Sequence, residues 1–138
     1  MSVINKNNNL LEKRRFVIGD VHGCFNTLTN LLFNILNINI NDEIYFLGDY
    51  IDRGPRSKEV LDLLLSLLEK EYHIFPISGN HETLMLNYNL SPANEQLWLV
   101  NGGKFTWRSF KVEHLRQGVV LSVITWILSL SFVPSEIS

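Results

Sequence analysis

Residues 43–54 read EIYFLGDYIDRG, an apolar run that ends at a glycine and continues directly into acidic and basic residues. The same arrangement occurs upstream in RFVIGDVHG (15–23) and downstream in YHIFPISGNHE (72–82). Short apolar runs bounded by glycine are typical of buried strands, although Pro76 weakens the third one. The chain therefore predicts three strands, each followed by a polar motif.

Two stretches with leucines at helical spacing separate these strands. The first follows Asn26, a residue type that caps helices, and its apolar stripe consists of Leu28, Leu31, Leu32, Ile35 and Leu36. The second follows Pro55, and its stripe consists of Val60, Leu61, Leu64, Leu65 and Leu68. Strands that alternate with helices predict an α/β fold with a largely parallel sheet. We expect further helices over residues 83–88, 95–100, 105–115 and 119–130.

Composition limits the class of protein. The chain has 138 residues, which suits a polar lead-in over residues 1–13 and one domain over residues 14–138. A net charge of −2 without a basic stripe argues against a nucleic-acid partner. The apolar residues 119–133 are too short to span a bilayer, so we expect a buried helix and no membrane partner. One cysteine, Cys24, indicates a reducing compartment, and we expect a cytoplasmic protein.

The polar motifs carry candidate metal ligands. Asp20 and His22 follow the first strand two residues apart, Asp49 follows the second, and Asn80 follows the third. Parallel strands bring their carboxyl ends to one edge, where ligands bind in α/β sheets. Alone, each motif would be a simple turn, a structural histidine or a helix cap. Together their carboxylate, imidazole and amide groups predict a site for Mn, Fe or Zn rather than Ca or Mg.

The three motifs GDVHG (19–23), GDYIDRG (48–54) and GNHE (79–82) are complete and in order. In this the chain resembles the calcineurin-like metallophosphoesterase superfamily, and within it the bacterial and phage members of the phosphoprotein phosphatase family. The segment NEQLWLVNGG (94–103) is also similar to those members. The resemblance covers residues 15–103, the N-terminal part of the family. It implies an α-β-β-α sandwich, of which this chain holds mainly the first sheet and its helices.

The resemblance also implies roles for the motif residues in binding two divalent ions, with Mn²⁺ the expected metal and Fe or Zn the alternatives. Asp20 and His22 would bind the first metal. Asp49 would bridge both metals, because a carboxylate has two oxygens to share. Asn80 would bind the second metal and contact the substrate phosphate. A metal-activated water would then attack phosphorus directly.

The remaining motif residues would act on the substrate. Arg53 would hold the phosphate, because its planar guanidinium matches phosphate oxygens. His81 would protonate the leaving oxygen, and Asp52 would fix the tautomer of His81. Glu82 is expected to be structural. The implied activity is hydrolysis of phosphate monoesters, on a phosphoprotein or a small phosphate ester. The alternatives are a symmetrical dinucleoside tetraphosphate hydrolase and a non-catalytic fragment that binds a metal or a partner.

The chain departs from the family pattern downstream of GNHE, where members supply two more histidines to the second metal. Besides His22 and His81 the chain has only His73, which we expect to be packed in the third strand, and His114, which lies in a polar helix-like stretch. We therefore expect a C-terminally truncated domain with an incomplete second metal site and impaired activity. We also expect the inner face of its sheet to be exposed.

Overall fold

A computed structural model of the chain describes residues 13–110. Its centre is a three-stranded parallel sheet in the order β1-β2-β3. The strands are β1 (Arg15–Ile18), β2 (Glu43–Phe46) and β3 (His73–Pro76), each four residues long. The predicted α/β class and parallel sheet are confirmed. Pro76 ends the edge strand β3, a position that tolerates proline.

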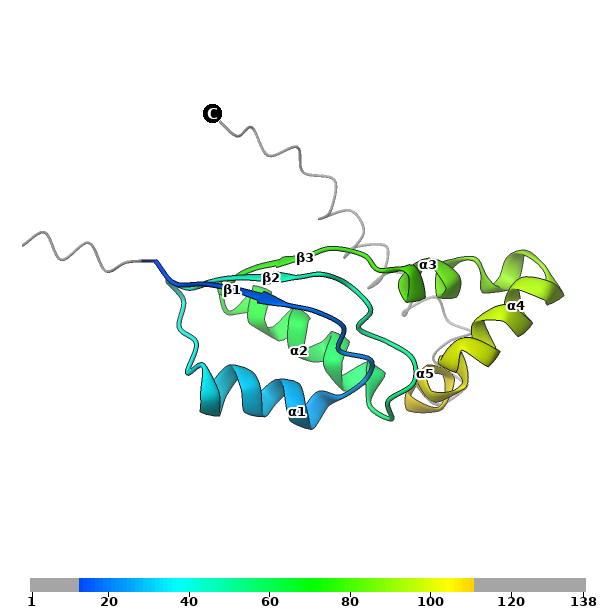
Figure 1. Cartoon of the computed structure of the whole chain (residues 1–138), viewed down its shortest axis with the longest axis horizontal. Coiled ribbons are helices and arrows are strands. Elements are labelled where there is room, and N and C mark those ends of the chain that lie inside the picture. Colours follow the sequence, from blue (N-terminus) through cyan, green and yellow to red (C-terminus); the bar gives the residue numbers. More distant parts are fainter. Residues whose placement is uncertain (1–12, 111–138) are drawn as a thin grey trace, which may run out of the picture.

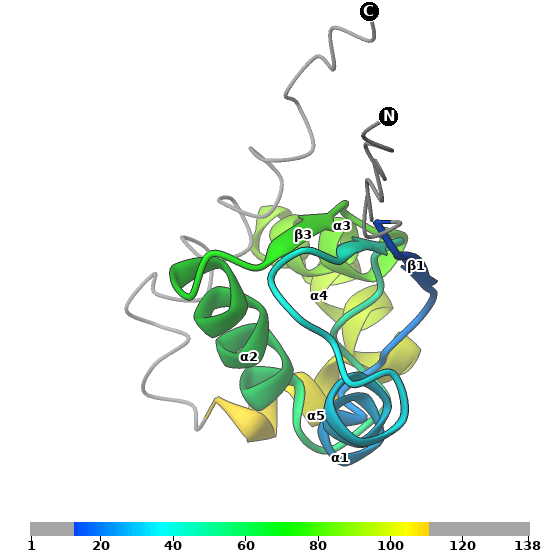
Figure 2. The ribbon, with the colours of Figure 1, turned by 90° about the vertical axis from the view of Figure 1, so that its left-hand side faces the viewer.

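One face of the sheet is covered by two helices (Figures 1 and 2). The first is α1 (Phe25–Thr29), which continues as the π-helical η1 (Asn30–Ile35), and the second is α2 (Ser57–Glu69). The side chains that form the core between these layers are apolar and almost fully buried. They include Ile18, Ile44, Phe46 and Ile74 from the sheet and Leu28, Leu32, Val60, Leu61 and Leu64 from the helices.

Two details of the first predicted helix are wrong. The helix begins at Phe25 after Cys24, and Asn26 does not cap it. The Oδ1 atom of Asn26 instead accepts a hydrogen bond from Arg56 at 2.6 Å. Ile35, predicted to be in the apolar stripe, is 65% exposed. The wider π turn, in which the N–H of Leu36 donates to the carbonyl of Leu31, shifts the residues off the 3.6-residue spacing.

The opposite face of the sheet is open within residues 13–110. Val17, Tyr45 and Phe75 lie in register across the strands and are 67%, 37% and 44% exposed. The predicted exposure of this face is therefore confirmed for the part described. His73, expected to be packed, is exposed on the same face. Side chains alternate along a strand, so the burial of Ile74 and Pro76 directs His73 outward.

The remaining helices gather at the end of the sheet where the strands end (Figure 1). They are α3 (Asn80–Leu86), η2 (Tyr88–Leu90), α4 (Pro92–Trp98), η3 (Leu99–Gly103) and α5 (Lys104–Ser109). At Gly102 the backbone turns with a φ of 109°, and this separates α4 from α5. None of the helices described is long and apolar enough to cross a membrane. His114 and the helix expected over 119–130 lie outside the described residues.

Candidate active site

The three polar motifs meet at the carboxyl edge of the sheet, as the strand pattern predicted, and Asp49 joins them. Its backbone carbonyl accepts hydrogen bonds from the N–H groups of Val21 (3.0 Å) and His22 (2.9 Å). Its side-chain Oδ1 accepts the N–H of His81 at 3.0 Å. Gly79 makes this contact possible, because a Cβ atom there would overlap the Asp49 carboxylate. A single residue therefore contacts the first and the third motif.

Glu82 fixes the turn that carries Asp49. Its carboxylate is fully buried and accepts the N–H groups of Asp49 (2.8 Å), Tyr50 (2.8 Å) and Gly79 (2.9 Å). Burial raises the pKa of the Glu82 carboxyl, while these backbone donors lower it, and the net direction is upward. The contacts are those of a structural residue, as expected for Glu82.

The backbone at the site is held in an uncommon conformation. His22, Asp49, Asp52 and Arg53 have φ values of 44°, 54°, 70° and 66°. Non-glycine residues in this left-handed region cost roughly 1–3 kcal/mol each and persist where the surroundings fix them. Such residues concentrate at ligand-binding and catalytic sites. Of the six non-glycine residues with positive φ in the described part of the chain, four are residues singled out from the sequence.

One group of side chains could hold a metal ion. Ligand atoms of His22, Asp49 and His81 all lie within 4.8 Å of one another. The Nδ1 atom of His22 lies 2.9 Å from the carbonyl oxygen of Ile51. A carbonyl can only accept, so Nδ1 carries the hydrogen and Nε2 keeps its lone pair for a ligand. Imidazole and carboxylate donors of this kind fit a divalent transition metal ion.

This group differs from the predicted ligand set. His22 and Asp49 belong to both, but His81, predicted to be an acid, lies in the group. Asp20 has an exposed side chain, and its Oδ2 atom is 3.6 Å from His22 Nε2. Asn80 is exposed at the start of α3. The group thus contains two of the four predicted ligands, with Asp20 beside it, while Asn80 is exposed at the first residue of α3.

Arg53 lies at the open side of the same group. Its Nη1 atom is 3.3 Å from Nε2 of His22, and the side chain is exposed. Its backbone N–H donates to the carbonyl of Gly102 at 3.2 Å. A Cβ atom at Gly102 would lie 2.8 Å from the Arg53 nitrogen, so only glycine allows this approach. The backbone of Arg53 is therefore held by Gly102, while its exposed guanidinium lies beside His22.

Asp52 and His81 form a buried pair, with Nδ1 of His81 2.8 Å from Oδ2 of Asp52. Their side chains are 0% and 3% exposed. Burial raises the pKa of the Asp52 carboxyl, against the opposing effect of hydrogen bonds from His81, Thr106 and Trp98. The pair joins the second motif to the third, and it leaves Nε2 as the ring nitrogen of His81 that does not face Asp52.

Sequence reasoning missed the residues that surround Asp52. Trp98 and Thr106 both donate hydrogen bonds to its carboxylate, from 46 and 54 residues downstream. Trp98 lies within the segment 94–103 that the sequence had marked. Its indole N–H was the available signal, because a buried tryptophan needs an acceptor. Nothing in the sequence identified Asp52 as that acceptor.

A sequence model described as calcineurin-like phosphoesterase matches residues 13–127. The chain belongs to the calcineurin-like phosphoesterase family. The match includes the three motifs that meet at the carboxyl edge of the sheet.

Relatives in the family carry two kinds of name. The chain is 36% identical to serine/threonine-protein phosphatase 1 of Salmonella typhimurium over 117 residues, which is 82% of this chain and 51% of that protein. It is 42% identical to the symmetrical bis(5'-nucleosyl)-tetraphosphatase of Wigglesworthia glossinidia brevipalpis over 72 residues, 51% of this chain and 25% of that protein. The enzyme of that name from Coxiella burnetii is 39% identical over 84 residues, 59% of this chain and 28% of that protein.

The chain therefore spans about half the length of its Salmonella relative and about a quarter of the other two.

Proposed function

We propose that this calcineurin-like phosphoesterase hydrolyses phosphate monoesters, in the manner of a protein serine/threonine phosphatase. The observation that carries the proposal is the buried Asp52–His81 pair, which stands beside the His22–Asp49 group and shares its open side with Arg53. These neighbouring residues support the proposal, because they would supply an acid, metal ligands and a phosphate-binding cation. The Salmonella relative named as a serine/threonine phosphatase supports the substrate class.

The metal ligands in this proposal are Asp20, His22, Asp49 and Asn80. Nε2 of His22, which accepts a hydrogen bond from Arg53 in this structure, and the carboxylate of Asp49 fit a divalent ion, with Asp20 3.6 Å from that Nε2. Mn²⁺ is the proposed metal, with Fe or Zn as alternatives, since the donors are mixed nitrogen and oxygen. When bound, divalent ions supply charge neutralisation and lower the pKa of a nucleophilic water.

The chain's own residues then handle the substrate. Arg53 binds the phosphate oxygens through its planar guanidinium, which is already directed at the point beside His22. His81 donates a proton to the leaving oxygen, and Asp52 holds the imidazole by Nδ1 so that Nε2 can act. No side chain is required as a phosphate acceptor, so hydrolysis proceeds without a phosphoenzyme.

The second candidate is a symmetrical bis(5'-nucleosyl)-tetraphosphatase, the name carried by the Wigglesworthia and Coxiella relatives. The third is a fragment that binds metal or a partner without catalysis. The exposed apolar sheet face of Val17, Tyr45 and Phe75 supports that possibility. A reducing, cytoplasmic location is proposed with all three, because Cys24 is a free thiol.

The proposal is tested by incubating the 138-residue protein with Mn²⁺ and either a phosphothreonine peptide or diadenosine tetraphosphate. We expect phosphate release from the peptide, and we expect His81→Asn to lower kcat about 10²–10⁴-fold. His73→Asn on the exposed sheet face is the matched control and should leave the rate unchanged. Cleavage of the dinucleotide alone would favour the second candidate. Metal binding measured by calorimetry without any hydrolysis would favour the third.

A further inference from the structure

The segment that runs from α4 to α5 contacts the loop of Asp52 and Arg53 at three points. Trp98, at the end of α4, and Thr106, in α5, reach the side chain of Asp52. Between them, the carbonyl of Gly102 accepts the N–H of Arg53. Asp52, proposed to hold the acid His81, and Arg53, proposed to bind the phosphate, therefore both contact one helical segment.

Besides His81, two side chains donate hydrogen bonds to the carboxylate of Asp52. The indole Nε1–H of Trp98 lies 3.1 Å from Oδ1 and 3.0 Å from Oδ2. The hydroxyl of Thr106 donates to Oδ1 at 2.7 Å. The carboxylate cannot rotate without breaking one of these bonds in a site that is closed to water. Its Oδ2 atom is thus kept toward Nδ1 of His81 at 2.8 Å.

The backbone of Asp52 is held by the same hydroxyl. Its N–H donates to Oγ1 of Thr106 at 2.7 Å and lies 3.2 Å from Oγ of Ser57. The two hydroxyl oxygens are 3.0 Å apart. Thr106 has one hydrogen, which goes to Asp52, so Ser57 must be the donor between the two hydroxyls. Thr106 therefore accepts from the main chain of Asp52 and donates to its side chain, at a residue whose φ is 70°.

We infer that Trp98 and Thr106 are positioning residues for the Asp52–His81 pair. They orient the Asp52 carboxylate so that Nδ1 of His81 carries the hydrogen and Nε2 is left for the His22–Asp49 side of the site. A carboxylate satisfied by three donors has one orientation, and the histidine that shares it has one tautomer. The catalytic meaning of this inference rests on the function proposed above, but the orientation of His81 does not.

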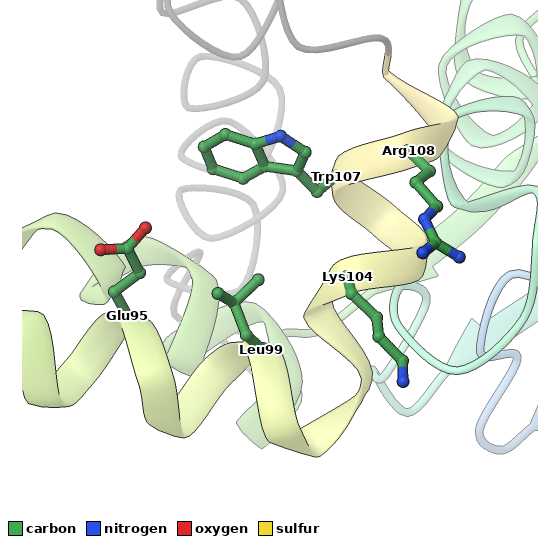
Figure 3. A pocket seen from close by; sticks show the side chains of 5 residues that line it. All are labelled: Glu95, Leu99, Lys104, Trp107 and Arg108. Carbon is green, nitrogen blue, oxygen red and sulfur yellow. The ribbon is translucent and has the colours of Figure 1, made fainter.

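Packing alone is the competing explanation, because Trp98 also belongs to an aromatic cluster. Its ring lies 5.3 Å from that of Tyr88 and 6.2 Å from that of Trp107, centre to centre. Trp107 offers a matched control, since its side chain lines a surface pocket with Glu95, Leu99, Lys104 and Arg108 (Figure 3). Within residues 13–110 no hydrogen bond joins Trp107 to Asp52. A test must therefore measure the tautomer of His81 and not only the stability of the protein.

The experiment is NMR of the ¹⁵N-labelled 138-residue protein in EDTA at one fixed pH. The hydrogen-bonded Nδ1 proton of His81 should give a low-field resonance that exchanges slowly with water. Trp98→Phe removes the indole donor, and Thr106→Val removes the hydroxyl at similar volume. We expect each variant to lose this resonance or to shift the ¹⁵N signals of His81 toward those of a mixture of tautomers.

The controls separate positioning from packing. Thr106→Ser keeps the hydroxyl and should restore the signals of His81. Trp107→Phe and Thr29→Val make the same chemical changes where no contact with Asp52 exists, so they should leave His81 unchanged. Unchanged His81 signals in folded Trp98→Phe or Thr106→Val would overturn the inference. If Thr106→Val does not fold, the inference is tested by comparing the His81 signals of Trp98→Phe with those of Trp107→Phe.

Failure of the proposed function gives a different result. The NMR readout uses neither metal nor substrate, so an inactive protein can still show the oriented His81. Conversely, the parent protein could release phosphate while Trp98→Phe and Thr106→Val leave the His81 signals unchanged. That result would support the proposed function and contradict the positioning role of Trp98 and Thr106.

Discussion

Asp52 and Asp20 both belong to motifs that follow a strand, yet their carboxylates differ in burial and in hydrogen bonding. Asp52 is fully buried and accepts hydrogen bonds from Trp98, Thr106 and His81. The side chain of Asp20 is 63% exposed, and its Oδ2 atom lies 3.6 Å from Nε2 of His22. In the half of the site around Asp52, protein groups satisfy the carboxylate. In the half around Asp20, the carboxylate is exposed and accessible to a ligand. Only the enclosed half should contribute strongly to the stability of the folded chain.

The largest difference between the two halves is expected when each aspartate is replaced by alanine. Asp52→Ala leaves a buried imidazole, an indole N–H and a hydroxyl without their acceptor. We expect the free energy of unfolding to fall by roughly 3–5 kcal/mol, as for other buried pairs that lose one partner. Urea unfolding in EDTA measures it.

The matching change, Asp20→Ala, should alter the free energy of unfolding by no more than about 0.5 kcal/mol, as is usual for exposed positions. Equal losses of unfolding free energy in Asp52→Ala and Asp20→Ala would contradict the conclusion that only the enclosed half contributes strongly to stability.

A smaller effect is expected at Glu82, which ties the enclosed half to the turn of Asp49. In Glu82→Gln, one carboxylate oxygen is replaced by an NH₂ group that cannot accept the N–H groups now bound there. We expect a loss of roughly 1–3 kcal/mol in the free energy of unfolding. Glu69→Gln, at the exposed end of α2, is the control and should change little. A Glu82→Gln variant as stable as the parent would contradict the structural role of this residue.

The smallest effect is expected far from the site, at Asp42. Its carboxylate accepts two hydrogen bonds from Arg14, at 2.9 and 2.6 Å, and these lower its pKa although burial opposes them. Because the folded pKa lies below the unfolded one, the stabilisation is present above about pH 4 and is lost as the pH falls through the folded pKa.

Thermal unfolding of Asp42→Asn should therefore show a modest loss at pH 7 that disappears in acid. Asp62→Asn, at an exposed pair with Lys58, is the reference and should show a weaker dependence on pH. A difference between Asp42→Asn and the parent that stays constant down to pH 3 would contradict the assignment.

Local pattern was sufficient to predict the sheet. Glycine-bounded apolar runs placed the three strands, and leucine spacing placed α2, because both signals arise within a few residues of one another. The same reasoning located His22 and Asp49 at one edge. It was wrong about Ile35 and Asn26, where a π turn and the contact with Arg56 decide the outcome. It was wrong about His73 because strand alternation, not overall polarity, determines which side chain faces outward.

The surroundings of Asp52 could not be predicted from the sequence. Its donors come from segments far along the chain, and their positions depend on how α4 and α5 pack against the loop after β2. Propensity and periodicity describe single elements, whereas this arrangement depends on the backbone turn at Gly102 and on its contact with Arg53. The grouping of His81 with the metal-ligand side is likewise a result of tertiary packing.

The distance along the chain between Asp52 and its donors has a consequence for synthesis on the ribosome. Thr106 is 54 residues downstream of Asp52, so the carboxylate is made well before the hydroxyl that orients it. At about 5–20 residues per second, the interval is on the order of 3–11 seconds. During that time the Asp52 carboxylate lacks the hydroxyl of Thr106 as a hydrogen-bond partner. Orientation of the Asp52–His81 pair by Thr106 can therefore begin only after the first 106 residues have been made.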